Sequence, residues 1–187
     1  MLTVEKPIVT SRLLLRPFVP ADVEALHVIR TEPDVLRYLY WPPATLDEVR
    51  EVVDRRRTMN RLVEENDYLV LAAVCRDTGR LVGEVDLCWT SVAHRHGEFG
   101  VILHPRAQGR GLATEAGTAL LDLAFGQLGL HRVSARTDSR NAACVAVLRR
   151  LGMRQEAHLR ECVRFAGQWY DELVLAVLAG EWAARGD

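Results

Sequence analysis

The strongest constraint on the fold of this chain is a run of three β-rich segments with no helix between them. The segments are residues 68–76, 81–89 and 97–104, and residues 77–80 form a turn sequence in which Gly79 can adopt positive φ. Connections this short join antiparallel strands, because parallel neighbours need a crossover of about a dozen residues or more. The sequence therefore excludes a doubly wound parallel sheet.

Helical and strand patterns alternate on both sides of this run. Thr45 and Glu48 have the spacing of a capping box and predict a helix that runs to about Leu62, and Gly152 is a typical residue just beyond a helix C-terminus. This order predicts an α/β fold, close to α+β, with a mixed, mostly antiparallel sheet of six to seven strands flanked by helices. The other expected elements are a strand over residues 12–18, a helix from Pro20, a helix over 113–127, a strand over 131–137, a helix over 141–151 and a hairpin of 154–165 with 169–178.

Length and composition place the chain among ordinary globular proteins. With 187 residues we expect one domain spanning residues 1–187, and 49% apolar with 26% charged residues is not the composition of a long disordered chain. The 24 basic and 25 acidic side chains give a net charge of -1, so no positive field indicates nucleic acid or an anionic membrane as a partner.

Features that the sequence lacks indicate a compartment. Residues 1–10 contain no apolar core of a signal peptide, and no stretch approaches the ~20 apolar residues of a membrane span. The four cysteines form no C-x-x-C pair, and His94 and His96 have no neighbouring acidic or thiol ligand, so we expect no metal site. Lys6 is the only lysine among many arginines, which favours a GC-rich bacterial source, and a reduced cytoplasm fits best.

The segment that carries chemistry is residues 108–116, between a predicted strand and an amphipathic helix. Gly109 and Gly111 let the backbone approach a ligand, and the following helix adds unpaired first-turn amides and the positive end of its dipole. Arg110 adds a positive charge. These features predict a phosphate or pyrophosphate site, although a Gly-x-Gly loop alone is equally compatible with a tight turn that binds nothing.

Two familiar phosphate-binding loops do not match this segment. A P-loop needs a Gly-Lys-Ser/Thr sequence, and the loop contains no lysine. A dinucleotide-binding loop belongs to the first βαβ unit of its fold, whereas this one follows four predicted strands, most of them in hairpin order.

The loop and several other segments resemble one known family. Gln108, Gly111 and Ala113 match the Gln/Arg-x-x-Gly-x-Gly/Ala motif of the GNAT superfamily of N-acetyltransferases. The resemblance covers about residues 10–178, the expected core of the domain. The chain is similar to the RimJ/RimL-type branch, in the same order, at Thr10-Ser11-Arg12-Leu13-Leu14-Leu15-Arg16-Pro17, Ala113-Thr114-Glu115-Ala116, Asn141-x-x-Cys144, Leu151-Gly152-Met153 and Gly167-Gln168-Trp169-Tyr170-Asp171.

The resemblance implies a fold and a co-substrate. The fold is the GNAT fold, whose sheet splays open after the fourth strand. The co-substrate is acetyl-CoA, with its pantetheine paired to strand backbone at Val101, Ile102 and Leu103. Asn141 is a further implied contact. The pyrophosphate is implied to lie on the loop, at Gln108, Gly109, Arg110, Gly111, Leu112, Ala113 and Thr114.

The implied reaction is direct transfer of an acetyl group from acetyl-CoA to a primary amine in a ternary complex. The amine belongs to a protein N-terminus or to a small molecule. It must lose a proton before it attacks, so a base is needed. Glu98 is the first candidate for this base, and Glu84 and Asp86 are alternatives that share one face of the preceding strand. Glu161 and His158, on the late strand, are further alternatives.

The departing thiolate needs a proton or a hydrogen bond. Leu148 stands where many family members have a tyrosine donor, and Cys144 stands where the branch often has a serine. Cys144 is therefore a candidate donor, with simple packing as the alternative. Asn141 is a catalytic or cofactor-binding candidate that can also cap the helix.

The acceptor pocket is expected to include aromatic side chains, because the family's helical insert and late hairpin wall that site. The candidates are Tyr38, Tyr40, Trp41, Trp89 and Trp169. A second hypothesis is a non-catalytic acyl-CoA-binding or sensory domain, which the missing tyrosine at Leu148 allows. The family often forms homodimers, and exposed sheet edges would permit one here.

Overall fold

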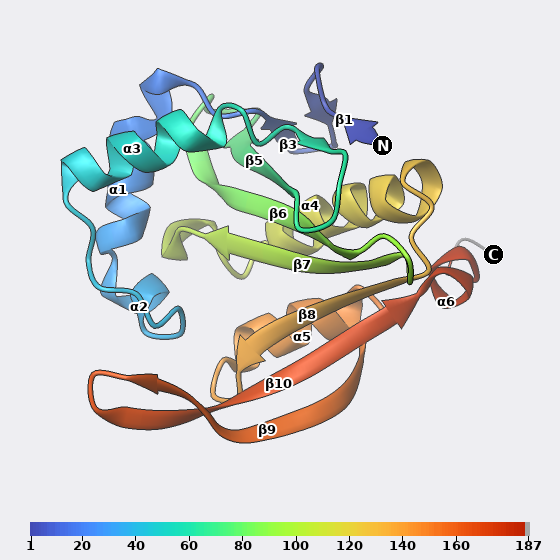
Figure 1. Ribbon diagram of the computed structural model, residues 1–187. Helices are drawn as coiled ribbons and strands as arrows, with labels where there is room; N and C mark the ends of the chain where they lie inside the picture. The colour runs from blue at the N-terminus through green and yellow to red at the C-terminus, as the bar shows by residue number, and fades with distance from the viewer. Residues whose placement is uncertain (186–187) are drawn as a thin grey trace.

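A mixed eight-stranded sheet forms the centre of the molecule (Figure 1). The computed structural model describes residues 1–185. The strand order is β2-β3-β5-β6-β7-β8-β10-β9, and β1 (Leu2–Thr3) pairs with β4 (Arg61–Leu62) in a separate two-stranded sheet. The strands of the large sheet are β2 (Ile8–Val9), β3 (Leu13–Arg16), β5 (Tyr68–Cys75), β6 (Leu81–Ser91), β7 (His96–Leu103), β8 (Arg132–Asp138), β9 (Arg154–Phe165) and β10 (Gln168–Leu178).

The pairing confirms the predicted fold class. β7 and β8 run parallel, whereas the other neighbouring strands of the large sheet run antiparallel. The edge strand β2 takes the sheet beyond the expected six to seven strands. Two residues show too little alternation to be recognised in a sequence.

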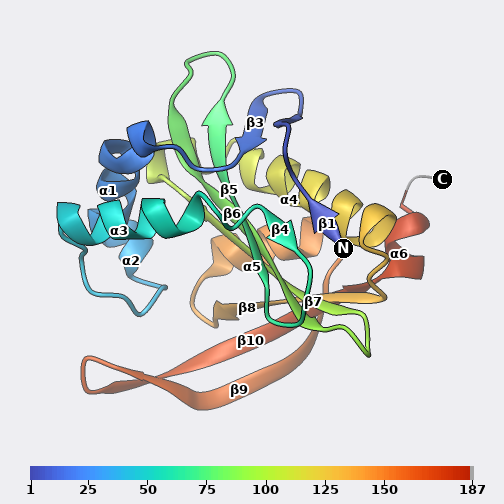
Figure 2. The ribbon, with the colours of Figure 1, turned by 45° about the horizontal axis from the view of Figure 1, so that its top comes forward.

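Helices cover both faces of the sheet (Figures 1 and 2). One layer holds α1 to α3, and the other holds α4 and α5. Among residues 1–185, no helix combines the length and the apolar composition that a membrane crossing requires. The helices are η1 (Pro20–Asp22), α1 (Val23–Thr31), α2 (Pro33–Leu36), α3 (Leu46–Arg56), η2 (Pro105–Ala107), α4 (Leu112–Asp122), its π-helical continuation η3 (Leu123–Gln127), α5 (Ala142–Arg150) and α6 (Ala179–Ala183).

β5 shows why the sheet needs a helical layer on each face. Leu69 and Leu71 belong to the hydrophobic cluster that includes side chains of α4 and α5. The alternate residues Val70 and Ala72 belong to a second cluster with side chains of α1 and α3. A strand buried on both faces reads as a continuous apolar run, and residues 69–75 do so.

The sheet opens between β7 and β8. These strands pair only from His96 to Glu98 on β7 and from Arg132 to Ser134 on β8. Beyond that point β7 continues to pair with β6 and β8 with β10, so the two halves of the sheet diverge, as Figure 1 shows. Part of β7 therefore has a strand partner on one side only. The opening follows the fourth strand that the sequence predicts, residues 97–104, and it is the splay that the resemblance implied.

The helix that starts after Thr45 is shorter than the sequence predicts. The capping box is present, since the Glu48 amide donates to Thr45 Oγ1 at 3.3 Å and the Thr45 amide donates to Glu48 Oε2 at 2.7 Å. The helix ends at Arg56 and not near Leu62. Leu62 pairs with Leu2 instead and is fully buried there, so a contact with a distant segment overrides the local helical pattern.

Gly117 on α4 allows this helix to pack closely on its neighbours. A Cβ atom at this position would lie 2.7 Å from Leu151 Cδ1 and 3.1 Å from Phe99 Cζ. Gly126, in the continuation of α4, has open space around it. The two glycines therefore have opposite steric surroundings within one helical segment.

We expect Gly117→Ala to lower the free energy of unfolding by about 1–3 kcal/mol, because the added methyl overpacks the junction of α4, α5 and β7. The control Gly126→Ala should be neutral or stabilising by up to about 1 kcal/mol, since it only removes backbone freedom from the unfolded chain. Urea denaturation of both variants measures the difference. Equal effects at the two positions would contradict the close approach of α4.

Candidate active site

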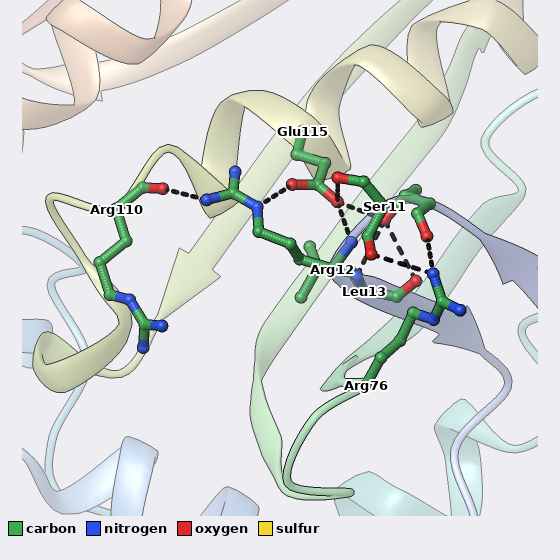
Figure 3. Close-up of polar contacts among 7 residues, drawn as sticks. Ser11, Arg12, Leu13, Arg76, Arg110 and Glu115 are labelled. Atoms are coloured by element: carbon green, nitrogen blue, oxygen red, sulfur yellow. Dashed lines mark hydrogen bonds and ion pairs between the residues drawn. The ribbon is translucent and has the colours of Figure 1, made fainter.

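The carboxylate of Glu115, in the first turn of α4, gathers the segment before β3 (Figure 3). Its Oε1 accepts hydrogen bonds from Thr10 Oγ1 at 2.6 Å, Ser11 Oγ at 3.0 Å and the Arg12 amide at 2.7 Å. Its Oε2 accepts from Arg12 Nε at 2.6 Å. Partial burial alone would raise the pKa of Glu115, but these hydrogen bonds outweigh it and lower the pKa to about 2.

Arg12 extends this network to the glycine loop. Its Nη1 donates to the Arg110 carbonyl at 2.7 Å, while the Arg110 side chain points away from Glu115 (Figure 3). Gly111 is the N-cap residue of α4 and has φ +78°. At the start of the loop, Gln108 Nε2 donates to the Leu103 carbonyl at 2.9 Å. Arg12 therefore fixes the loop at the Arg110 carbonyl, and Gln108 fixes the start of the loop to the end of β7.

The amides of the loop are left free by this arrangement. Within residues 1–185, the amides of residues 109–114 make no hydrogen bond. Thr114 Oγ1 is buried, and it too has no hydrogen-bond partner among these residues. A row of free amides at a helix N-terminus attracts phosphate, because the donors and the helix dipole act together.

A cavity of about 750 Å³ lies beside these amides, and we call it the loop cavity. It extends from Arg12 and the glycine loop, along β7, to α5. Arg110, also predicted as a contact, is not among its lining residues. The predicted cofactor contacts that do line it are Val101, Ile102, Leu103, Gln108, Gly109, Gly111, Leu112, Ala113, Thr114 and Asn141.

A second cavity, of about 460 Å³, lies on the face of the sheet that α1 and α3 cover, and we call it the sheet cavity. Its walls include Trp41 and the carboxylate residues Glu84, Asp86 and Glu98. The two cavities meet where β7 leaves β8. They share the lining residues Tyr38, Leu39, Val101, Ile102, Asn141 and Cys144.

The three carboxylates of the sheet cavity differ in their surroundings. Glu84 is buried and accepts two hydrogen bonds from Arg56. Glu98 lies 3.7 Å from Arg136 Nε, and its side chain is 40% exposed. Burial raises the pKa of Glu98, and the charge of Arg136 opposes this rise. Both groups therefore already have a guanidinium partner.

Asp86 is the carboxylate that remains available. It lies opposite Gly100 on β7, where a Cβ atom would come within 2.5 Å of its Oδ1. Its carboxylate forms no hydrogen bond or ion pair with any residue in the described part of the chain. Burial raises the pKa of Asp86 to about 6, against the nearby charge of Arg56 and with that of Glu98. Perturbed carboxylates in a cavity are typical of functional sites.

Asn141 and Cys144 lie at the junction of the two cavities. Asn141 Oδ1 accepts from the Cys144 amide at 3.0 Å and so caps α5, which leaves its amide nitrogen without a partner among residues 1–185. Burial raises the pKa of Cys144, although the Thr137 side chain opposes this. The Cys144 thiol is therefore a neutral hydrogen-bond donor and not a thiolate nucleophile.

Of the five aromatic residues predicted for the acceptor pocket, Tyr38 lines both cavities and Trp41 lines the sheet cavity, whereas the other three line neither. Tyr40 donates to Asp138 Oδ2 at 2.9 Å and packs on Tyr170. Trp89 is buried in the main hydrophobic cluster, and Trp169 is 56% exposed on the late hairpin. Aromatic residues far apart in sequence cannot be assigned to one wall without the tertiary fold.

Other lining residues escaped the sequence analysis. Leu39 lies between α2 and α3 and contributes to both cavities. Arg55 and Arg56 end α3 and line the sheet cavity. The helix looked like an ordinary charged surface helix, and no spacing marked these two arginines as facing a cavity.

Comparisons with known proteins agree with this geometry. Residues 12–154 match the family model of the acetyltransferase (GNAT) domain. The uncharacterized N-acetyltransferase YnaD of Bacillus subtilis (strain 168) is 29% identical over 175 residues, covering 94% of this chain and 98% of that relative. The spermidine N(1)-acetyltransferase of Escherichia coli (strain K12) is 26% identical, covering 91% of this chain and 88% of that relative.

A solved structure gives the same result for the fold. The acetyltransferase (GNAT family) from Bacillus anthracis superposes with a TM-score of 0.83 at 26% identity, covering 93% of this chain and 99% of that one. The fold and the two cavities define an acetyltransferase of the splayed-sheet type. This chain belongs to the GNAT family and is an N-acetyltransferase that uses acetyl-CoA.

We expect Glu115→Gln to lower the free energy of unfolding at pH 7 by about 1–3 kcal/mol, because a neutral amide replaces a charged acceptor of four hydrogen bonds. The folded pKa of about 2 lies below the usual ~4.3. This group therefore stabilises the fold above pH ~4.3, and the stabilisation is lost as the pH falls toward 2.

Denaturation midpoints between pH 2 and 7 measure this effect. The variant should lose part of the acid destabilisation that the natural protein shows. The control Glu51→Gln, on the exposed side of α3, should stay within about 0.5 kcal/mol of the natural protein. An unchanged acid profile in Glu115→Gln would contradict the role of the network.

Proposed function

We propose that the protein transfers the acetyl group of acetyl-CoA directly to a primary amine, of a small molecule or a protein N-terminus, in a ternary complex. The observation that carries this proposal is the junction of the two cavities. One contains a row of free amides, and the other contains the unpartnered carboxylate of Asp86. A non-catalytic acyl-CoA-binding or sensory domain would need the first cavity, but it would not need Asp86 in the second cavity or Cys144 at the junction.

The loop cavity suits acetyl-CoA in both shape and chemistry. The free amides of residues 109–114 would hold the pyrophosphate, with Thr114 Oγ1 as a further donor. Residues 101–103 of β7, which lack a β8 partner, would pair with the pantetheine amides. The thioester would then lie at the end of the cavity, near Asn141 and Cys144.

In the sheet cavity, Asp86 replaces Glu98 as the proposed general base. The carboxylate would accept a hydrogen bond from the ammonium group of the acceptor and take one of its protons before the nitrogen attacks. With a pKa of about 6, Asp86 is mostly ionised at neutral pH and still close enough to that pH to accept a proton effectively. Glu98 is less suitable because Arg136 pairs with it.

The rest of the reaction depends on backbone and thiol donors. As the new C–N bond forms, the carbonyl oxygen gains charge, and an amide of the unpaired part of β7 would stabilise it. The C–S bond then breaks, and the electron pair leaves on sulfur. The Cys144 thiol would donate a hydrogen bond to that sulfur. The second proton of the nitrogen would pass to the sulfur, which gives the neutral amide and the CoA thiol, while the first proton stays on Asp86.

Four broader expectations belong to this proposal. The chain would act as a single acetyltransferase domain over residues 1–187, with its core at about 10–178. It would be located in the cytoplasm. Within the family, it would belong to the RimJ/RimL-type branch. A homodimer would be compatible with the exposed hairpin of β9 and β10. The relatives named for spermidine support an amine as the acceptor.

Gly111→Glu should abolish the binding of acetyl-CoA, because a side chain and a negative charge would enter the site of the pyrophosphate. Gly129→Glu is a matched control: Gly129 has φ +69°, similar to +78° at Gly111, but does not line the loop cavity. Calorimetric titration with acetyl-CoA, with NAD as a second ligand, measures the effect. Tight binding by a folded Gly111→Glu variant would refute the position of the pyrophosphate.

Asp86→Asn should lower kcat by about 10²–10⁴-fold, the usual contribution of a general base, with little change in the affinity for acetyl-CoA. The natural enzyme should gain activity as the pH rises through about 6, and the variant should lose this limb. Glu98→Gln is the comparison. If Glu98→Gln is inactive and Asp86→Asn retains its rate, the base is Glu98.

A further inference from the structure

Three arginines gather at the end of the sheet cavity that α1 and α3 close. Arg55 and Arg56 lie in the last turn of α3 and line the cavity, and Arg30 lies in the last turn of α1. One carboxylate, that of Glu84, faces two of them. Arg56 Nη2 donates to Glu84 Oε1 at 2.9 Å, and Arg30 Nη2 lies 3.9 Å from the same oxygen.

Arg30 increases the positive field behind the cavity wall. Its side chain is only 16% exposed, and its guanidinium lies 4.6 Å from the centroid of the Trp41 ring. Its Nε is buried and has no hydrogen-bond partner in the part of the chain that the structure describes. Burial and then the charge of Arg55 lower the pKa of Arg30. An anion beside Arg55 would relieve this repulsion.

Arg55 is the guanidinium that is available to a ligand. It is exposed at the mouth of the sheet cavity and forms no ion pair with any of residues 1–185. Other arginines of the same helix differ. Arg50 pairs with Asp47, and Arg57, just beyond the last turn, pairs with Asp54 at 3.3 Å. Neither of these two lines the cavity.

We propose that the acceptor carries a carboxylate in addition to its primary amine, so that Asp86 receives the amine and Arg55 receives the carboxylate. This inference rests on the proposed function, because it places the reacting amine at Asp86. The planar fork of donors on a guanidinium matches the two oxygens of a carboxylate. A polyamine would instead bring a second cation toward Arg55 and Arg30, which is unfavourable.

The test compares acceptors that differ only at the end remote from the amine. A series of ω-amino acids, from glycine to 6-aminohexanoate, is assayed with acetyl-CoA by release of the CoA thiol. Each is compared with the alkylamine and the α,ω-diamine of equal carbon number. At least one ω-amino acid should exceed its alkylamine by about tenfold or more in kcat/KM, which corresponds to about 1.4 kcal/mol. The diamine should fall below the alkylamine.

Substitution of Arg55 connects this preference to the cavity. Arg55→Gln should reduce the ratio of kcat/KM between the best ω-amino acid and its alkylamine toward one. Arg57→Gln is the matched control, because Arg57 is a neighbouring arginine that does not line the cavity. It should keep the ratio of the natural enzyme.

The outcomes separate this inference from the proposed function. A diamine that is a better acceptor than its ω-amino acid, or a ratio unchanged in Arg55→Gln, would overturn the inference while leaving acetyl transfer intact. If no acceptor reacts, calorimetry of the protein saturated with CoA compares the binding of each ω-amino acid with that of its alkylamine. An ω-amino acid that binds no tighter than its alkylamine would also overturn the inference. Absence of acetyl-CoA binding is the separate result that defeats the proposed function.

Discussion

The carboxylate of Glu115 holds together three parts of the chain on which the acetyl-CoA site depends. Through its four hydrogen bonds it connects the first turn of α4 to residues 10–12. Arg12 then reaches the Arg110 carbonyl. In the planar trans peptide, an Arg110 carbonyl turned toward Arg12 leaves the Gly111 amide facing the opposite way. Hydrogen bonds to a charged acceptor are about twice as strong as neutral ones, so a single side chain can set the geometry of the loop.

The second condition is the separation of β7 from β8. Backbone groups in a sheet normally satisfy each other, and unpaired buried ones are costly. Here residues 101–103 of β7 line a cavity, so a bound substrate can complete their pairing. The same opening lets the loop cavity and the sheet cavity meet at Asn141 and Cys144. One irregularity of the sheet therefore supplies both a binding surface and a passage between two substrates.

The charged side chains of the sheet cavity differ in whether they have an oppositely charged partner. Glu84 pairs with Arg56 and Glu98 with Arg136, which leaves the Asp86 carboxylate without a partner among residues 1–185. Arg56 is likewise paired, whereas Arg55 forms no ion pair within the same residues. An unpaired carboxylate and an unpaired guanidinium in one cavity would suit a ligand that carries both an amine and a carboxylate. The spermidine-acetylating relatives share the family, and we infer that the acceptor of the present chain differs from a polycation.

Local patterns in the sequence determined the fold class and the order of the elements, and they marked the loop that we propose binds acetyl-CoA. Closely spaced β-rich runs, the Thr45 capping box and the residues Gln108, Gly111 and Ala113 act over a few neighbours, so they can be read one segment at a time. The end of α3 was not predictable in this way, because Leu62 is buried against Leu2. Nor were the positions of Trp89 and Trp169, or the choice of Asp86 over Glu98. Strand alternation shows which carboxylates share a face, but only the tertiary structure decides which of them meets an arginine from another element and which is left to face the substrate.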